Sequence, residues 1–143
     1  MTKLIGINHV AIEVGDLEEA LELYQRLFEV RLRGRAHGMA FIDMGDQFLA
    51  VSQGRTQGPD EHRHFGLVVD DVDAVREACK REGLTTSGRG SVTFRDPWGN
   101  QFQVVAYQDI QFERSDGVRR ALGIEELSKS PSAVREIEER GLG

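Results

Sequence analysis

The chain contains the same strand–helix pattern twice, and this internal repeat constrains its fold more than any other feature of the sequence. HVAIEVGDLEEA begins at His9, and HFGLVVDDVDAV begins at His64, 64 − 9 = 55 positions later. Each stretch reads as a histidine, an apolar strand, an acidic cap and an amphipathic helix. A second pair of landmarks, GDQF from Gly45 and GNQF from Gly99, is separated by 99 − 45 = 54 positions. The agreeing offsets predict a tandem duplication with residues 54–63 as the connector.

Each half of the repeat predicts the element order βαβββ. In the first half we expect a strand over 5–14, a helix capped by Asp16, and strands near 30–35, 39–44 and 47–52. In the second half we expect a strand over 64–69, a helix over 72–82, and strands near 84–87, 91–95 and 101–107. The fold class is therefore α+β, with tandem βαβββ modules (about 4–53 and 64–107) that form a curved mixed sheet around a cleft.

The last quarter of the chain has no counterpart in the first half. Residues 108–143 read as two short helices separated at the Ser-Lys-Ser-Pro stretch around Pro131. We expect an accessory segment that packs on the core or on a second chain. A length of 143 residues is typical of one domain, so the whole chain is predicted to be a single domain.

Composition excludes several classes of function. The formal net charge of −6 provides no electrostatic basis for nucleic-acid binding. No apolar run reaches the length of a membrane span, and the N-terminus lacks a signal-peptide pattern, so we expect a cytoplasmic protein that binds no membrane. The single cysteine, Cys79, excludes an internal disulfide. Because it falls at helical spacing with apolar neighbours, it is expected to be a packed helix residue.

The polar residues of three expected strands fall on faces that the helices do not cover. Successive strand residues point to opposite faces, so His9 shares a face with Ala11 and Glu13 while Val10, Ile12 and Val14 point the other way. The same alternation places His64 and Gln103 away from the apolar faces of their strands. A single histidine here would most simply be a satisfied, partly buried polar residue. Two histidines at equivalent positions of a duplicated unit are expected to come together by pseudo-twofold symmetry, and imidazole is a frequent metal ligand.

These motifs carry a family resemblance. INHVAIEVGDLEEALELYQRLF, HFGLVVDDVDAV and DPWGNQFQVV together resemble the vicinal oxygen chelate superfamily, over roughly residues 4–107. That superfamily includes glyoxalase I, extradiol dioxygenases, fosfomycin-resistance enzymes and bleomycin-resistance proteins. The resemblance implies the tandem βαβββ fold, and it does not select one reaction, because one scaffold hosts many chemistries.

The resemblance also implies a set of metal ligands. The family's histidine ligands fall on His9 and His64, and the ligand after the DPxGN turn, normally glutamate, falls on Gln103. The further glyoxalase I ligand falls on Leu49, which disfavours classical glyoxalase I. Gln103 disfavours an extradiol dioxygenase, whose iron normally takes a carboxylate. A divalent metal is implied, with zinc, nickel, manganese and iron all open.

Other residues are candidates for a site on the same face. Glu13 is the one carboxylate on the face of His9, and we name it as the candidate catalytic base. Candidate substrate-binding residues are Phe41, Leu49, Arg95 and Trp98, for each of which a structural role is the competing interpretation. His62 lies in the connector and is expected to be exposed.

Two functions of different classes remain open. The first is a metal-dependent lyase, isomerase or dioxygenase-type enzyme in which His9, His64 and Gln103 hold a metal that chelates substrate oxygens. The second is a metal-free protein of the bleomycin-resistance type that binds a small molecule, which the neutral Gln103 and the apolar Leu49 favour. Either function is expected in a homodimer with a small-molecule ligand.

Overall fold

The computed structural model describes residues 1–143, and its contacts divide the chain into two compact units. The first unit comprises residues 1–59 and 97–100, and the second comprises residues 60–96 and 101–143. The division falls within the predicted connector, and the short turn 97–100 belongs to the first unit although it lies in the second half of the sequence. Each unit contains a sheet of its own, of four and three strands respectively.

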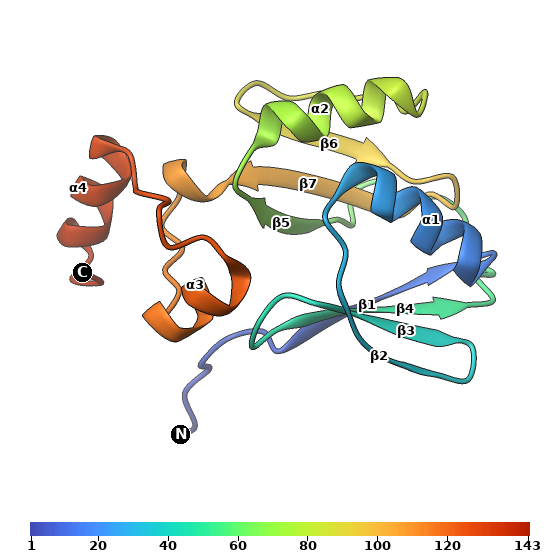
Figure 1. The fold of residues 1–143 in the computed structure, drawn as a ribbon, viewed down its shortest axis with the longest axis horizontal. Coiled ribbons are helices and arrows are strands. Elements are labelled where there is room, and N and C mark those ends of the chain that lie inside the picture. Colours follow the sequence, from blue (N-terminus) through green and yellow to red (C-terminus); the bar gives the residue numbers. More distant parts are fainter. The chain divides into compact units, whose positions relative to one another are not determined.

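The first unit has the predicted βαβββ order (Figure 1). Its elements are β1 (His9–Val14), α1 (Leu17–Leu27), β2 (Leu32–Ala36), β3 (Met39–Asp43) and β4 (Phe48–Gln53). The strand order is β1-β4-β3-β2, in which β1 runs parallel to β4 and the other neighbours are antiparallel. The first strand begins at His9 rather than at residue 5, and residues 1–8 are exposed and form no regular structure.

Helix α1 forms where the sequence predicts it, for local reasons. The Asp16 side chain accepts a hydrogen bond from the backbone N–H of Glu19 at 2.9 Å, which caps the first turn. Apolar residues at helical spacing then form one buried face: Leu17, Ala20, Leu21, Leu23, Tyr24 and Leu27. The N–H of Leu17 donates to Gln53 Oε1 at 3.2 Å, so the start of α1 is tied to the end of β4.

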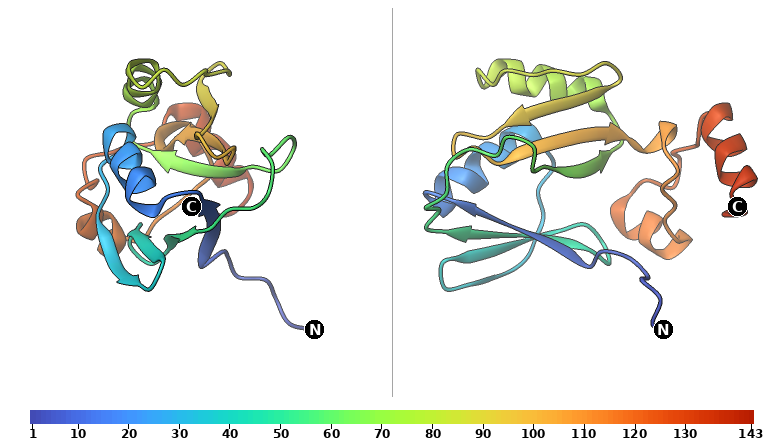
Figure 2. Two further views of the ribbon diagram at one scale, coloured as in Figure 1. Left: turned by 90° about the vertical axis from the view of Figure 1, so that its right-hand side faces the viewer. Right: turned by 180° about the vertical axis from the view of Figure 1, so that it is seen from behind.

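The second unit repeats this order with one strand fewer. It contains β5 (Phe65–Val69), α2 (Val72–Arg81), β6 (Ser91–Arg95) and β7 (Gln101–Ala106), in the strand order β5-β7-β6. Strand β5 runs parallel to β7, and β6 runs antiparallel to it. Figure 2 shows α2 alongside these strands, and it contacts β6 and β7. The core includes the stacked rings of Phe94 and Phe102, whose centroids are 4.8 Å apart.

The strand predicted near 84–87 is reduced to a single bridge between Ser87 and Thr93. The reason lies in the turn that follows. Gly88 has a φ of +102°, and a Cβ atom at this position would lie 2.7 Å from the Ser91 carbonyl oxygen. The chain therefore reverses tightly at Gly88, where only glycine fits, and little length remains for a ladder.

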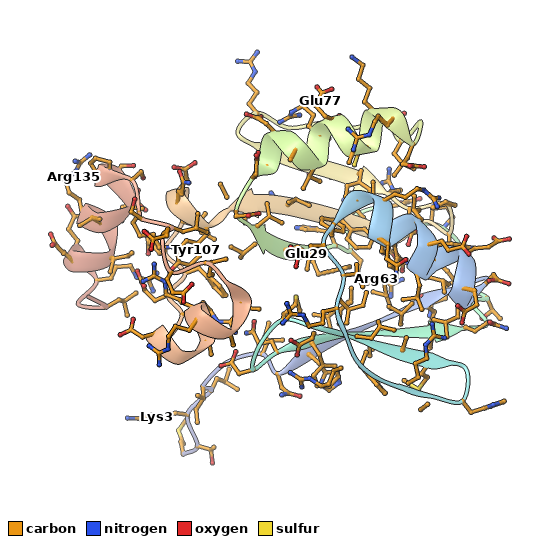
Figure 3. The ribbon with its side chains drawn as sticks, viewed as in Figure 1. Lys3, Glu29, Arg63, Glu77, Tyr107 and Arg135 are labelled. Carbon is orange, nitrogen blue, oxygen red and sulfur yellow. The ribbon has the colours of Figure 1, made fainter.

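The C-terminal segment contains the two predicted helices, α3 (Asp116–Leu122) and α4 (Pro131–Glu139), after a short 3₁₀ turn η1 (Tyr107–Asp109). Helix α4 contacts η1. The Lys129 ammonium donates to the carbonyl oxygens of Tyr107, Ile110 and Phe112 at 2.5, 2.9 and 2.6 Å. It also lies 3.5 Å from the centroid of the Tyr107 ring, which Figure 3 labels within this segment. Lys129 thus ties the start of the segment to the start of α4.

The observed architecture confirms the α+β class with two βαβββ-like modules and mixed pairing. The strands form two sheets, because no ladder joins the four-stranded and three-stranded sets. No helix has the length and apolar character needed to cross a membrane.

Candidate metal-binding residues

Strand β1 presents His9 on the face that α1 leaves uncovered. Along this strand Ile12 and Val14 are buried, at 7% and 0% exposure, while His9, Ala11 and Glu13 are exposed. The alternation predicted from the sequence is therefore confirmed in β1. Its cause is the two-residue period of an extended chain with one covered face.

The His9 ring has two defined contacts. Its Nδ1 lies 2.9 Å from Asn8 Oδ1, and its plane stacks on the Phe48 ring with a centroid distance of 4.7 Å and an interplanar angle of 7°. A carboxamide oxygen only accepts hydrogen bonds, so this contact favours the proton on Nδ1. The other nitrogen, Nε2, then carries the lone pair that a metal ligand needs.

His64 has the same protonation pattern in the second unit. It lies directly before β5 and is exposed, and its Nδ1 lies 2.8 Å from the carbonyl oxygen of His62. Because a carbonyl oxygen is also an acceptor only, Nδ1 carries the proton and Nε2 the lone pair. The two repeat-equivalent histidines thus both contact an oxygen acceptor through Nδ1.

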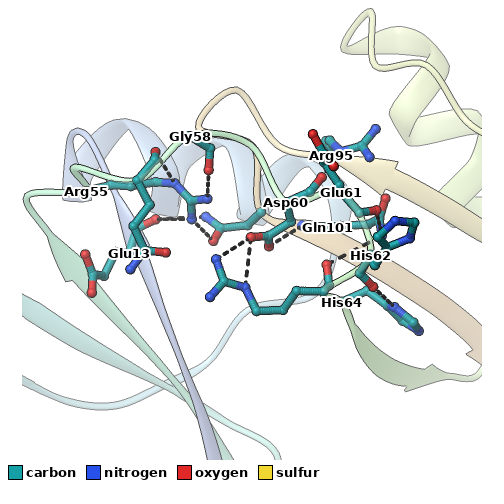
Figure 4. Close-up of polar contacts among 12 residues, drawn as sticks. Glu13, Arg55, Gly58, Asp60, Glu61, His62, His64, Arg95 and Gln101 are labelled. Carbon is teal, nitrogen blue, oxygen red and sulfur yellow. Dashed lines mark hydrogen bonds and ion pairs between the residues drawn. The ribbon is translucent and has the colours of Figure 1, made fainter.

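A small hydrogen-bonded cluster holds the end of the connector before His64 (Figure 4). The carboxylate of Asp60, a residue only 9% exposed, accepts from Arg63 at 2.8 Å and from the Gln101 backbone N–H at 3.3 Å. Arg95 Nε donates to the Asp60 carbonyl oxygen at 2.7 Å. Arg95, predicted to contact a substrate, therefore has a structural partner, and its contact with a substrate stays a prediction.

Gln103 lies half-buried in β7, the middle strand of the three-stranded sheet. It pairs with Gly66 of β5 on one side and Thr93 of β6 on the other. His64 precedes Gly66 by two residues, and positions two apart share a face. His64 lies just before β5, which begins at Phe65, and the strand alternation continued back by one residue assigns it to the face of Gly66 and Gln103. A Cβ at Gly66 would meet only the Gln103 carbonyl oxygen, at 3.9 Å, so the space directly over Gly66 is open.

The ladders correct the sequence-derived equivalence between Leu49 and Gln103. Gly66 pairs with Gln103 in the β5–β7 ladder, and its repeat counterpart Ala11 pairs with Ala50 in the β1–β4 ladder. The position that matches Gln103 in the first sheet is therefore Ala50. Leu49 points to the opposite face and is only 4% exposed, in the core of the first unit. A one-residue shift in register exchanges the two faces of a strand, which accounts for the difference.

Two of the other candidates lie on the face of His9. Phe41 of β3 packs edge-on against Phe48, with centroids 5.8 Å apart, and Phe48 in turn stacks on His9. Glu13 lies four residues beyond His9 on β1, and its side chain is exposed. Phe48 was missed in the sequence, because its place beside His9 depends on the register of the parallel β1–β4 pair, which no local pattern shows.

Trp98 has a packing role in the turn 97–100. A Cβ atom at Gly15 would lie only 2.6 Å from Trp98 Nε1, so the indole lies directly on the backbone of the β1–α1 turn. The neighbouring Asn100 donates through Nδ2 to the Glu13 carbonyl oxygen at 2.9 Å and accepts from Arg55 Nη1 at 2.5 Å. These contacts fasten the turn to the end of β1, and a contact of Trp98 with a substrate stays a prediction.

No group of three or more histidine, cysteine, aspartate or glutamate side chains that could hold a metal is present. The proposed donors are two neutral imidazoles and one neutral amide, so the protein supplies no charge to them. Cys79 is fully buried, and burial raises the pKa of its thiol, so it stays protonated at neutral pH. It is the packed helix residue that its spacing predicts.

Known proteins resemble this chain in sequence and in fold. The metallothiol transferase FosB of Bacillus licheniformis is 25% identical over 116 residues, which are 71% of this chain and 75% of that protein. FosB of Lysinibacillus sphaericus is 25% identical over 112 residues, 68% of this chain and 79% of that protein. Among solved structures, the fosfomycin resistance protein FosX of Listeria monocytogenes, complexed with Mn(II) and sulfate, superposes with a TM-score of 0.63. It is 18% identical over 73% of this chain and 91% of that one, a likeness of fold.

A family model covers most of the repeat. The model of the glyoxalase/bleomycin resistance protein/dioxygenase superfamily matches residues 6–104, which include both histidines and Gln103. The tandem modules, the parallel β1–β4 and β5–β7 pairs and this match agree. The chain belongs to the glyoxalase/bleomycin resistance protein/dioxygenase superfamily.

Proposed function

We propose that this chain is a metal-dependent enzyme of the vicinal oxygen chelate type that acts on a small oxygen-bearing substrate. His9, His64 and Gln103 are the proposed ligands of one divalent metal, with water completing the shell. The carrying observation is that both histidines bond an oxygen through Nδ1, at 2.9 and 2.8 Å, which directs the Nε2 lone pair outward. A shared tautomer at repeat-equivalent positions supports a shared task. We also propose that the whole chain, residues 1–143, works as a single domain.

The chemistry of the donors fits a borderline divalent cation. Imidazole nitrogen suits zinc, nickel and iron, and an amide oxygen also suits manganese. Because all three donors are neutral, the charge of the ion is not offset by its ligands. We therefore expect moderate metal affinity and a preference for an anionic substrate. When bound, such an ion polarises neighbouring substrate oxygens and stabilises negative charge that develops on them.

Glu13 is the proposed proton acceptor. Glu13 shares a face with His9 and lies four residues away, about 13 Å along the strand. We therefore do not propose it as a second ligand of the metal that His9 binds. An exposed carboxylate on the same face is placed to take a proton from a substrate that extends along the strand from His9. Phe41 and Phe48 supply an apolar wall on the same face.

The relatives guide the choice of substrate to assay. The FosB relatives are named metallothiol transferases, and a FosX structure is complexed with Mn(II) and a dihydroxypropylphosphonic acid. We propose a small anionic substrate, and fosfomycin with a thiol or with water is the first probe. Lyase, isomerase and dioxygenase-type reactions on small oxygen-rich acids are the further probes.

Metal analysis of protein purified without added metal or chelator tests the proposal. Calorimetric titration with zinc, nickel and manganese is then run on the wild type and on His9→Ala, His64→Ala and His62→Ala. We expect one metal per chain in the wild type and loss of binding, by about 100-fold or more, in the first two variants. His62→Ala is the matched control. It removes an imidazole two residues before His64 and keeps the backbone carbonyl oxygen that His64 Nδ1 contacts. Binding that survives both His9→Ala and His64→Ala contradicts the proposal.

The alternative function is metal-free capture of a small molecule, as in bleomycin-resistance proteins. The neutral Gln103, with Ala50 at the matching position of the other sheet, favours it. In this alternative the protein binds its ligand without a metal. A wild type that binds an organic ligand equally well with and without chelator supports this alternative and contradicts the metalloenzyme.

A further inference from the structure

Asn8 and Phe48 surround His9 in an arrangement that His64 lacks. We infer that these two residues are positioning residues, which fix the tautomer and the ring plane of His9 so that Nε2 is presented as a donor. The inference rests on the proposed function, because metal binding by His9 is the purpose that we assign to these contacts. The arrangement itself is measurable in metal-free protein.

The three residues form a closed set of contacts. The backbone N–H of Phe48 donates to the Asn8 carbonyl oxygen at 3.2 Å, which anchors the residue before β1 on β4. The Asn8 side-chain oxygen lies 2.9 Å from His9 Nδ1. The Phe48 ring then stacks on the His9 ring at 4.7 Å and 7°. Each residue therefore contacts the other two, and the contacts favour one ring plane and one tautomer of His9.

The Phe48 ring is itself held in place by its neighbours. The Arg33 guanidinium lies 4.9 Å from its centroid, and Phe41 meets it edge-on at 5.8 Å. Arg33 is fixed by hydrogen bonds to Asp43 at 3.1 Å and to the Gly45 carbonyl oxygen at 2.5 Å. The Phe48 ring that stacks on His9 is thus held by contacts on its other sides, which favours one direction for the His9 ring.

The hydrogen-bond acceptor of His9 Nδ1 can be removed by mutation, whereas the acceptor of His64 Nδ1 cannot. His64 bonds the backbone carbonyl of His62, which every residue type at position 62 supplies. His9 depends on the side chain of Asn8. Substitution at Asn8 therefore changes the acceptor directly, and His62→Ala is a control that keeps the equivalent acceptor.

Long-range ¹H–¹⁵N correlation spectra of metal-free protein, recorded at about pH 8.5 where imidazoles are ordinarily neutral, test the inference. We expect His9 in the wild type to show a protonated Nδ1 and an unprotonated Nε2. Asn8→Ala shifts His9 toward the Nε2–H tautomer, Asn8→Asp keeps the Nδ1–H form, and His62→Ala leaves the His64 signals unchanged. An unchanged His9 tautomer in Asn8→Ala overturns the role of Asn8.

Ring-current shifts test Phe48 in the same samples. The stacked phenyl ring displaces the carbon-bound His9 protons upfield, so Phe48→Leu moves them downfield and Phe48→Tyr restores them. Unchanged His9 proton shifts in Phe48→Leu overturn the role of Phe48.

Zinc calorimetry connects the arrangement to metal binding. Loss of a partner of a ligating histidine typically costs about 10–100-fold in metal affinity, so Asn8→Ala is expected to lose that much and Asn8→Asp to regain it. Wild-type affinity in Asn8→Ala overturns the inference. A wild type that binds no zinc, nickel or manganese defeats the proposed function instead, and the tautomer spectra still decide whether Asn8 and Phe48 hold His9.

Discussion

At the scale of single residues, Gln103 decides the charge of the proposed site. Gln103→Glu replaces a neutral oxygen by an anionic one at the same reach, so we expect zinc and manganese affinity to rise by at least about tenfold, or about 1.4 kcal/mol. The added negative charge is also expected to weaken the binding of an anionic substrate. Calorimetry on both variants measures the change, and Gln108→Glu, an exposed position in η1, controls for net charge alone.

The same substitution has the opposite consequence in a metal-free pocket. Gln103 is half-buried between β5 and β6, so an unpaired carboxylate there lowers the free energy of unfolding, by about 1–3 kcal/mol. A lower melting temperature without a gain in affinity for any metal contradicts the metalloenzyme.

At the scale of elements, the turn 97–100 depends on close contact with the β1–α1 turn. A Cβ at Gly15 would lie 2.6 Å from Trp98 Nε1, so Gly15→Ala must displace the indole. We expect a loss of about 1–3 kcal/mol in the free energy of unfolding, measured by urea denaturation. Gly34→Ala is the matched control, because a Cβ there meets nothing within 4 Å. Equal stability of Gly15→Ala and wild type contradicts this account.

The C-terminal segment depends on one ammonium group. Lys129 donates to three carbonyl oxygens, so Lys129→Met keeps the length of the side chain and leaves those acceptors without their donor. We expect a cost of about 1–3 kcal/mol and faster amide exchange in α4. Hydrogen-exchange mass spectrometry of residues 107–143 measures it, with Lys80→Met, an exposed position in α2, as the control. Unchanged exchange in α4 shows that Lys129 does not hold the segment.

At the scale of the whole molecule, we predict a homodimer. Residues 4, 5 and 7 are exposed apolar side chains, with Leu4 at 104%, Ile5 at 99% and Ile7 at 68%, and β1 is an edge strand of its sheet. Light scattering is expected to give twice the chain mass of 16.0 kDa. Combined Leu4→Asp and Ile5→Asp substitutions should shift the protein to monomer, whereas Val134→Asp in α4 should not. A monomeric wild type at micromolar concentration contradicts the prediction.

Much of the fold follows from local patterns in the sequence. The repeat predicts the module order, Asp16 and Asp71 mark the starts of α1 and α2, and the alternation around Ile12 assigns the covered face of β1. The proposed ligands His9, His64 and Gln103 also come from the sequence, through the repeat and the family motifs. The caps and the alternation were predictable because each depends on residues within a few positions of one another, and the repeat was predictable because its two copies are similar in sequence.

Only the tertiary structure revealed the features that depend on strand pairing. The sequence aligned Leu49 with Gln103, whereas the ladders place Ala50 there, and Phe48 was not recognised as the partner of His9. The sequence by itself therefore determined the repeat, the helices and which residues alternate in each strand. The tertiary structure decided the register and hence the neighbours of His9. The physical reason is that register is set by distant backbone hydrogen bonds and loop lengths, and a shift of one residue exchanges the faces of a strand while leaving its local pattern intact.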